Sequence, residues 1–175
     1  MAYLFETEHL LIRSFQSADA QRLYENHLEE NVKKWIPNES YHSLEEAQHA
    51  IAFYADCVKH NRLPYVLAVT LKTSGELIGD TGLNEVQGKP GEVEIGYTIC
   101  QKHSSNGYAT ELLGAMTRFV SSAFGAQVLY GRVMRGNQAS VRVLEKNGYI
   151  LVDEEFGAED DPYSLGMLIY KNSLE

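Results

Sequence analysis

Residues 104–109, SSNGYA, have the composition of an anion-binding loop at the start of a helix. Three short polar residues with hydroxyl and amide donors precede Gly107, and an apolar stripe with helical spacing follows. The first turn of a helix carries unpaired N–H groups and a partial positive charge, so a phosphate can bind there if side chains leave room. Gly107 and Ala109 leave that room. Taken alone, the residues favour an ordinary helix start capped by Ser105 or Asn106, because one glycine is weak evidence for an anion site.

A carboxylate and a second helix start flank this loop in the sequence. Glu94 lies on the polar side of EVEIGYTI, the alternating segment at residues 92–99. Asn137 is placed to cap the later segment NQASVRVLEKNGY, and Ser140 follows three residues on. A strand carboxylate can simply be solvated, and a first-turn serine can bond to helix backbone. Neither residue alone therefore indicates catalysis.

Taken together, in this order and spacing, these segments resemble the GNAT family of acetyl-coenzyme A-dependent N-acetyltransferases. The resemblance is carried by EVEIGYTICQKHSSNGYATELL and NQASVRVLEKNGY. EIGY, GYATE, N-x-x-S and EKNGY, with the stretches LLIRSF and WIPNESYHSLEEA, are similar to the branch of ribosomal-protein N-terminal and spermidine acetyltransferases. The resemblance implies direct transfer of an acetyl group to a primary amine, either a protein N-terminus or a small cationic amine. A non-catalytic acyl-coenzyme A-binding module of the same fold is the alternative.

The resemblance assigns coenzyme binding to the loop and to the strand before it. In the family, a Gln/Arg-x-x-Gly-x-Gly/Ala loop wraps the pyrophosphate, and residues 104–109 match it. The family usually has glycine at the position of Ser105 and a basic residue at that of Asn106, so Lys102 and His103 are the nearest substitutes for the missing charge. The residues implied to contact the coenzyme are Thr98, Ile99, Cys100, Ser104, Ser105, Asn106, Gly107, Tyr108, Ala109, Thr110 and Asn137.

Acyl transfer from a thioester requires an amine that loses its proton, a stabilised oxyanion and a proton for the departing thiolate. By resemblance, Glu94 is the base, directly or through water, and Ser140 protonates the thiolate. A backbone N–H around residues 98–100 would serve as the oxyanion donor. Leu144 stands where many relatives have a tyrosine acid. Cys100 is not expected to be a nucleophile, because transfer in the family is direct and no sequence neighbour activates the thiol.

The acceptor site is expected at Trp35, Pro37 and Tyr41, with the acidic loop at residues 159–161 as a further candidate. Loop packing and solvation of charge also explain each of these. The net charge of −9 favours a cationic acceptor and argues against nucleic acid as a partner. No cluster of His, Cys and Asp has the spacing of a metal site, so no metal is expected.

Periodicity predicts the order strand, two helices, three strands, helix, strand, helix, two strands. Ser17 is expected to cap the first helix, and Ser43 with Glu46 forms a capping box for the second. Pro37 makes residues 33–40 a predicted loop. Strands are expected at residues 9–15, 64–71, 77–86, 92–99, 127–134, 149–156 and 163–170, and later helices at 44–58, 109–123 and 138–146.

This order predicts an α/β (mixed α+β) GNAT fold. A strand–helix–strand crossover from residue 92 to residue 134 requires one parallel pair, which the family splays. We expect a central, mostly antiparallel mixed sheet of about seven strands, flanked by about four helices. At 175 residues, the chain is expected to form a single domain, residues 1–175.

Composition also bounds the setting of the protein. No apolar run approaches the roughly 20 residues that span a bilayer, so no membrane partner is expected. The opening MAYLFETEHLLIRSF shows no secretion signal. Cys57 and Cys100 match no redox or metal spacing and are expected as reduced thiols in the cytoplasm. The sequence is compatible with a homodimer.

Overall fold

The computed structural model describes residues 4–174 of the chain. Internal contacts divide it into two compact units: unit 1 contains residues up to Leu83 and Tyr97–Ala109, and unit 2 contains Asn84–Gly96 and the residues from Thr110 onward. Eight strands hydrogen-bond in the order β1-β2-β3-β4-β5-β6-β8-β7. Strands β5 and β6 are parallel, whereas the other described registers are antiparallel. The predicted mixed, mostly antiparallel sheet with one parallel pair is confirmed.

Unit 1 is built on an antiparallel meander of buried strands. The turn between β3 and β4 contains Gly75 at φ +72°, a conformation that glycine adopts without a Cβ clash. In β3, every residue except Val66 is buried, as expected for a central strand. The strands of this unit are β1 (Phe5–Glu6), β2 (Leu10–Arg13), β3 (Tyr65–Leu71), β4 (Leu77–Glu85) and the end of β5 (Glu92–Ile99).

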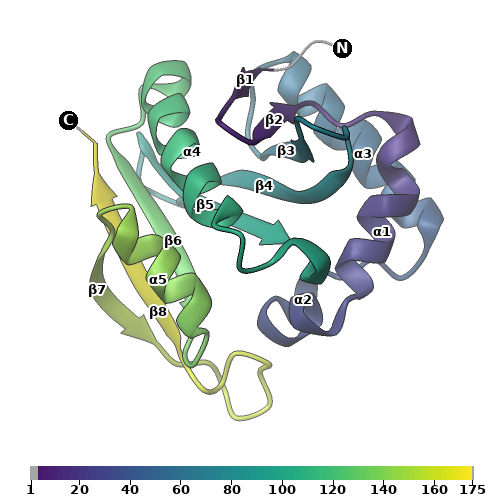
Figure 1. The fold of residues 1–175 in the computed structure, drawn as a ribbon. Coiled ribbons are helices and arrows are strands. Elements are labelled where there is room, and N and C mark those ends of the chain that lie inside the picture. The colour runs from purple at the N-terminus through teal and green to yellow at the C-terminus, as the bar shows by residue number, and fades with distance from the viewer. Residues whose placement is uncertain (1–3, 175) are drawn as a thin grey trace. The chain divides into compact units, whose positions relative to one another are not determined.

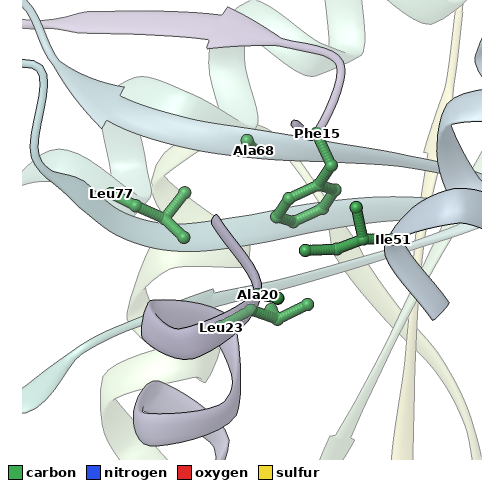
Figure 2. Packing of buried hydrophobic residues seen from close by; sticks show 6 residues of the cluster. All are labelled: Phe15, Ala20, Leu23, Ile51, Ala68 and Leu77. Carbon is green, nitrogen blue, oxygen red and sulfur yellow. The ribbon is translucent and has the colours of Figure 1, made fainter. Parts of the chain in front are cut away.

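Three helices accompany these strands: α1 (Ala20–Leu28), α2 (Glu30–Trp35) and α3 (Leu44–Lys59). Helix α3 packs against α1 and β3 (Figure 1). Figure 2 shows the ring of Phe15 between the side chains of Leu77 and Ile51, within a buried cluster that also holds Ala20, Leu23 and Ala68. Burying each large apolar side chain contributes about 1.5–3 kcal/mol, which fixes the helices against the strands.

The start of α3 confirms the predicted cap with one change of partner. Ser43 Oγ accepts a hydrogen bond from the Glu46 N–H at 3.1 Å. The Glu46 carboxylate instead accepts from the N–H of His42, at 2.6 Å.

The predicted cap at Ser17 is wrong, because a 3₁₀ turn, Ser17–Asp19, precedes α1. Asp19 Oδ2 accepts the Gln16 N–H at 2.8 Å and so closes that turn. The buried guanidinium of Arg13 holds the same carboxylate through two hydrogen bonds of 2.6 and 2.9 Å. A long-range charged contact therefore decides this helix start, and local cap preference does not.

The predicted loop at residues 33–40 is also wrong in part. Helix α2 extends to Trp35, and Pro37–Glu39 form a second 3₁₀ turn. Proline is tolerated at the first position of a helical turn, where its missing N–H has no partner to lose. It still ends α2, because Ile36 before it adopts φ −135° and ψ 61°.

Unit 2 combines the start of β5 with strands and helices from the second half of the chain. Its elements are α4 (Tyr108–Phe124, from Thr110), β6 (Val128–Met134), α5 (Gln138–Lys146), β7 (Ile150–Glu155) and β8 (Met167–Ser173). The β5–β6 register runs from Glu92↔Val128 to Glu94↔Tyr130. Strand β8, yellow in Figure 1, lies between β6 and β7 and pairs with both.

The last strand begins later than predicted. Residues 163–165 belong to a turn, in which Asp161 Oδ1 accepts the Tyr163 N–H at 2.8 Å. Gly166 closes the turn at φ +107°, and β8 begins at Met167. Side-chain capping by Asp161 overrides the strand-like alternation of YSL.

Residues 4–174 contain eight strands and five α-helices, against about seven and about four expected. The additions are short: β1 has two residues and α2 has six. Within the same residues, no helix has the length and apolar character needed to cross a membrane.

Candidate active site

The loop before α4 has the backbone that an anion cradle needs. A 3₁₀ turn, Gln101–His103, leads into it, and α4 begins at Tyr108. Ser105 and Gly107 both adopt left-handed φ values, +63° and +83°. A Cβ added at Gly107 would meet nothing within 4 Å, so the space beside this backbone is open. The left-handed φ at Ser105 also explains why glycine suits this position.

The polar side chains of the loop brace the loop itself. Ser104 Oγ donates to the Gln101 carbonyl at 2.7 Å. Asn106 Nδ2 donates to the carbonyls of His103 and Ser104, each at 3.1 Å. These donors were predicted to face an anion, and the structure gives them other acceptors. An anion at this loop would therefore depend mainly on the first-turn N–H groups of α4.

Lys102 and His103, the predicted substitutes for the missing basic residue, both pair with Glu76. Lys102 Nζ lies 3.3 Å and His103 Nε2 lies 3.2 Å from its carboxylate, and Arg22 approaches at 3.1 Å. Desolvation raises the pKa of Glu76, but hydrogen bonds and charges from His103 and Lys102 outweigh it and lower that pKa. Much of the positive charge at the loop is therefore balanced within the protein.

Backbone hydrogen bonds at the end of β5 restrict which N–H group could serve as the predicted oxyanion donor. The Cys100 N–H donates to the Ile78 carbonyl at 2.8 Å, so it is not available to an oxyanion. Since successive N–H groups of a strand point to opposite edges, the N–H of Ile99 faces away from β4. Gly79 permits the tight β4–β5 contact, because a Cβ there would lie 2.0 Å from the Thr98 carbonyl oxygen. The predicted N–H donor within residues 98–100 is thus restricted to Ile99.

The surroundings of Cys100 disfavour a role as a nucleophile. The residue is only 1% exposed, and its thiol is free of any disulfide. Burial and the nearby Glu29 charge raise the pKa of the thiol, so the reactive thiolate is disfavoured.

Thr98 belongs to a buried polar network that sequence reasoning missed. In the alternation of EVEIGYTI it shares the polar side with Glu94, but it is 9% exposed, and its Oγ1 donates to Asp80 Oδ2 at 2.8 Å. The same oxygen lies 2.8 Å from His27 Nε2, and His27 Nδ1 lies 2.8 Å from the Glu39 carbonyl. The sequence feature that could have indicated this network is Asp80, the one charged residue of the segment LIGDTGL.

The charges around His27 favour its protonated form. Burial alone would lower the pKa of His27. The charge and hydrogen bond of Asp80, with the Glu39 carbonyl, outweigh burial and raise that pKa to about 9.

Two of the predicted acceptor residues, Pro37 and Tyr41, lie near this network in unit 1. The ring of Tyr41 lies 5.0 Å from that of His27, and burial raises the pKa of the Tyr41 hydroxyl. Pro37 begins the turn that presents the Glu39 carbonyl. Trp35 ends α2, with the Lys34 ammonium 4.5 Å from its ring centroid. The acidic loop at residues 159–161 belongs to unit 2, where Asp161 closes a turn.

In unit 2, Glu94 lies on β5 beside Arg132 of β6. Arg132 Nε is 4.0 Å from Glu94 Oε2, whereas its terminal nitrogen lies 2.5 Å from Glu155 Oε2. The guanidinium is therefore held mainly by Glu155. The side chain of Glu94 remains 36% exposed, which allows it to exchange protons with a substrate or water.

Asn137 caps α5 as predicted: its Oδ1 accepts the Ser140 N–H at 3.2 Å. Both residues are partly exposed. Leu144 is buried against β6, where a Cβ at Gly131 would lie 2.5 Å from Leu144 Cδ2. The position at which many relatives carry a tyrosine acid therefore contributes packing here.

Comparison with known proteins decides the family. Residues 9–150 match the family model described as acetyltransferase (GNAT) domain. The chain belongs to the GNAT acetyltransferase family. It is 28% identical over 146 residues to the uncharacterized N-acetyltransferase YoaA of Bacillus subtilis (strain 168), covering 83% of this chain and 82% of that protein.

Two solved structures share the fold of this GNAT acetyltransferase. The ribosomal-protein-S5-alanine acetyltransferase of Vibrio fischeri aligns with a TM-score of 0.83 at 18% identity, covering 97% of this chain and 95% of that one. A RimL ribosomal L7/L12 alpha-N-protein acetyltransferase in complex with coenzyme A aligns with a TM-score of 0.81 at 16% identity, covering 99% and 98%.

One further residue of this GNAT acetyltransferase escaped sequence reasoning. Asn147 Nδ2 donates to the Thr110 carbonyl of α4 at 3.2 Å and to the Val143 carbonyl of α5 at 2.8 Å. Gly114 makes room for it, since a Cβ there would lie 2.8 Å from Asn147 Oδ1. Asn147 thereby ties α5 to the first part of α4. The motif EKNGY contained this residue, but its partner is far away in sequence.

Proposed function

We propose that this GNAT acetyltransferase uses acetyl-coenzyme A to acetylate a primary amine by direct transfer. The observation that carries the proposal is the loop before α4. Its backbone is left-handed at Ser105 and Gly107, the space at Gly107 is open, and a helix begins immediately afterwards. These features fit a pyrophosphate, because helix N-terminal N–H groups bind phosphate oxygens.

Residues 104–109 would hold the pyrophosphate, with Thr110 and Asn137 as further contacts. Acetyl-coenzyme A supplies the acetyl group as a thioester when bound. The Ile99 N–H, which faces away from β4, is the proposed donor to the oxyanion. Thr98 and Cys100 shape the same strand end from inside the protein, where both are buried.

Glu94 is the proposed base, and two observations support it. Its carboxylate is partly exposed, and the adjacent Arg132 is held mainly by Glu155. Glu94 would take a proton from the ammonium form of the acceptor, directly or through water, leaving the nitrogen lone pair for the thioester carbonyl. A positioned base of this kind accelerates a reaction by typically about 10²–10⁴-fold.

Ser140 is the proposed proton donor to the thiolate. Its N–H is fixed by Asn137, which sets the backbone of the first turn of α5. Leu144 and the buried Tyr149 offer no alternative acid, since burial raises the pKa of the Tyr149 hydroxyl to about 12.

The proposed acceptor is a protein N-terminus or a small cationic amine, bound near Trp35, Pro37 and Tyr41. The net charge of −9 supports a cation. The fold neighbours named for ribosomal-protein S5-alanine and L7/L12 alpha-N-protein acetylation make protein N-termini the first acceptors to test.

A non-catalytic acyl-coenzyme A-binding module is the second candidate. The pairing of Lys102 and His103 with Glu76 favours it, because that pairing reduces the charge available to a pyrophosphate. Binding without chemistry requires only the loop.

Incubation with acetyl-coenzyme A and a panel of peptides, polyamines and amino acids separates the two. We expect release of free thiol together with acetylation of one acceptor class, detected by mass spectrometry, with each thiol released matched by an acetyl group gained. Binding without turnover across the panel would favour the module. Calorimetry that detects no binding of acetyl-coenzyme A or coenzyme A would contradict both.

A further inference from the structure

His27 makes two contacts that a neutral imidazole cannot satisfy together. Nε2 lies 2.8 Å from an Asp80 carboxylate oxygen, and Nδ1 lies 2.8 Å from the Glu39 carbonyl oxygen. Both partners are acceptors, and neutral histidine has only one N–H. With Asp80 as a carboxylate, this geometry requires the doubly protonated imidazolium. The ring is buried, with 3% of the residue exposed, so water does not replace a missing donor.

The two contacts of the imidazolium lead to different parts of unit 1. Through Nδ1 it holds the carbonyl of Glu39, within the turn that begins at Pro37 and precedes Tyr41. Ser40 Oγ donates to the His27 carbonyl at 3.1 Å and joins the same turn to α1 a second time. The segment proposed to bind the acceptor is thus fixed to one histidine.

Through Nε2 the imidazolium holds Asp80, and Asp80 holds β5. Asp80 Oδ2 accepts from both His27 and the Thr98 hydroxyl, each at 2.8 Å. Thr98 immediately precedes Ile99, whose N–H is the proposed oxyanion donor. The Thr98 hydroxyl therefore sets the position of the residue next to that donor.

We infer that His27 is a positioning residue for acetyl transfer, which fixes the acceptor segment through the Glu39 carbonyl and the oxyanion strand through Asp80 and Thr98. The inference rests on the proposed function. It adds that one buried charge couples the placement of the amine to the placement of the thioester carbonyl. His27 itself touches neither substrate in this arrangement.

The groups that face His27 determine when the coupling holds. Asp80 approaches from β4, Glu39 from the 3₁₀ turn, and Tyr41 from the segment before α3. Tyr54 of α3 interacts with Tyr41 and carries a raised pKa, because its hydroxyl is buried. Asp80 and Glu39 are the acidic groups, and both favour a protonated His27. Deprotonation of His27 should release the Glu39 carbonyl, the Asp80 carboxylate, or both.

The first experiment replaces His27 by glutamine. His27→Gln removes the charge and one of the two opposed donors. We expect the Michaelis constant for the amine to rise about tenfold or more, because hydrogen bonds from charged donors are the stronger class. The affinity for acetyl-coenzyme A, measured by calorimetry, should stay within about threefold, because residues 104–109 are untouched. A loss of folded protein alone would lower kcat without raising the Michaelis constant.

His60→Gln is the matched control. His60 pairs with Asp56 at 3.2 Å in unit 1, but its side chain is 56% exposed. The same chemical change at an exposed pair should leave both Michaelis constants unaltered.

Thr98→Val tests the connection from Asp80 to β5 and keeps the His27–Asp80 pair. It removes the hydroxyl with little change of shape, so the protein should fold. We expect kcat to fall about three- to tenfold, with the Michaelis constant for the amine unchanged, because only the strand branch is released. An unchanged kcat would overturn the coupling to the strand.

A measurement on the unmodified protein keeps the inference testable if His27→Gln does not fold. Nitrogen-15 NMR of the imidazoles should show His27 protonated at both nitrogens at neutral pH. A neutral ring there would overturn the inference. If the unmodified protein is active and His27→Gln keeps the same Michaelis constant for the amine, the inference about His27 is overturned and the proposed function stands. If the unmodified protein is inactive across the acceptor panel, the proposed function is removed as well.

Discussion

A charged pair of unit 1 and a charged pair of unit 2 lie in contrasting environments. In unit 1, Arg13 and Asp19 pair with side chains only 8% and 10% exposed. In unit 2, Arg132 and Glu155 pair at a similar distance, but their side chains are 37% and 51% exposed. Losing one partner of a buried pair costs about 3–5 kcal/mol, whereas an exposed pair contributes about 0–1 kcal/mol. The buried Arg13–Asp19 pair therefore fixes structure, whereas the Arg132–Glu155 pair is open to exchange with solvent.

The candidate residues follow the same contrast. Thr98 and its partners in unit 1 are buried and bonded to specific acceptors, which suits binding and positioning. Glu94 and Ser140 in unit 2 are partly exposed, which suits proton transfer. Five measurements test this contrast.

Asp19→Asn should have the largest effect, because it leaves the buried Arg13 without a countercharge. We expect a loss of about 3–5 kcal/mol in the free energy of unfolding, measured by urea denaturation. Glu155→Gln is the matched change in unit 2 and should cost less than about 1 kcal/mol. Equal losses in the two variants would remove the contrast.

The stability of unit 1 should depend on pH through His27. Its folded-state pKa, about 9, lies above the ordinary value of 6.5. The stabilisation is therefore fully present below pH 6.5 and is lost as the pH rises through about 9. The loss is on the order of 3 kcal/mol, because a tenfold change in proton affinity corresponds to about 1.4 kcal/mol. Denaturation curves from about pH 6 to about pH 10 should show this decline, and His27→Gln should flatten it. A similar dependence of the unfolding free energy on pH in both proteins would assign it to groups other than His27.

Glu94→Gln should lower the rate without weakening donor binding. We expect kcat to fall about hundredfold or more, the typical contribution of a positioned base. Acetyl-coenzyme A affinity should change little, because the change lies outside residues 104–109. Glu92→Gln, on the same side of the same strand, is the control. An unaltered rate near neutral pH would exclude Glu94 as the base.

Gly107→Val should weaken donor binding about tenfold or more, because a β-branched residue is strained at positive φ and would occupy the open space of the loop. Calorimetry with coenzyme A measures the effect. Gly88→Val is the control, since Gly88 has φ +76° and nothing within 4 Å of an added Cβ, in the turn between β4 and β5. Tight coenzyme binding by Gly107→Val would contradict the cradle.

Ser105→Gly should have the smallest effect and the opposite sign. Ser105 adopts φ +63°, where glycine avoids a clash of the Cβ atom. Relief of that strain should improve coenzyme affinity by less than about fivefold, since such strain amounts to about 1 kcal/mol. Weaker binding by the glycine variant would show that the Ser105 hydroxyl is itself a ligand.

Local patterns predicted most elements of the fold. The caps at Ser43 and Asn137 and the stripe of α4 all depend on residues close in sequence, and all are present. The errors occur where a distant or non-repeating contact decides. The pair of Arg13 with Asp19 places the start of the first helix after Asp19. The turn closed by Asp161 precedes the last strand, which therefore begins later than predicted.

The candidate site divides in the same way. The positive φ at Gly107 agrees with the glycine of the motif. The engagement of the Cys100 N–H by Ile78 and of Lys102 by Glu76 involves residues from another strand or turn, which a motif does not encode. Asp80, the partner of His27, is 53 residues away in sequence, so no local pattern indicated that His27 would be charged. Sequence motifs thus predict the site residues, and tertiary pairing decides which of their atoms are available to a ligand.

The place of β8 between β6 and β7 has a consequence for the order of assembly. Both neighbours precede β8 in the chain, so each has an unpaired edge until β8 is made and inserted. Strand β7 exposes Ile150, Leu151 and Val152, an apolar run that makes an open edge prone to association. We expect the amides of β6 and β7 to gain protection from hydrogen exchange in one step with those of β8 during refolding. Nascent chains that stop before Met167 should therefore be the ones that require a chaperone.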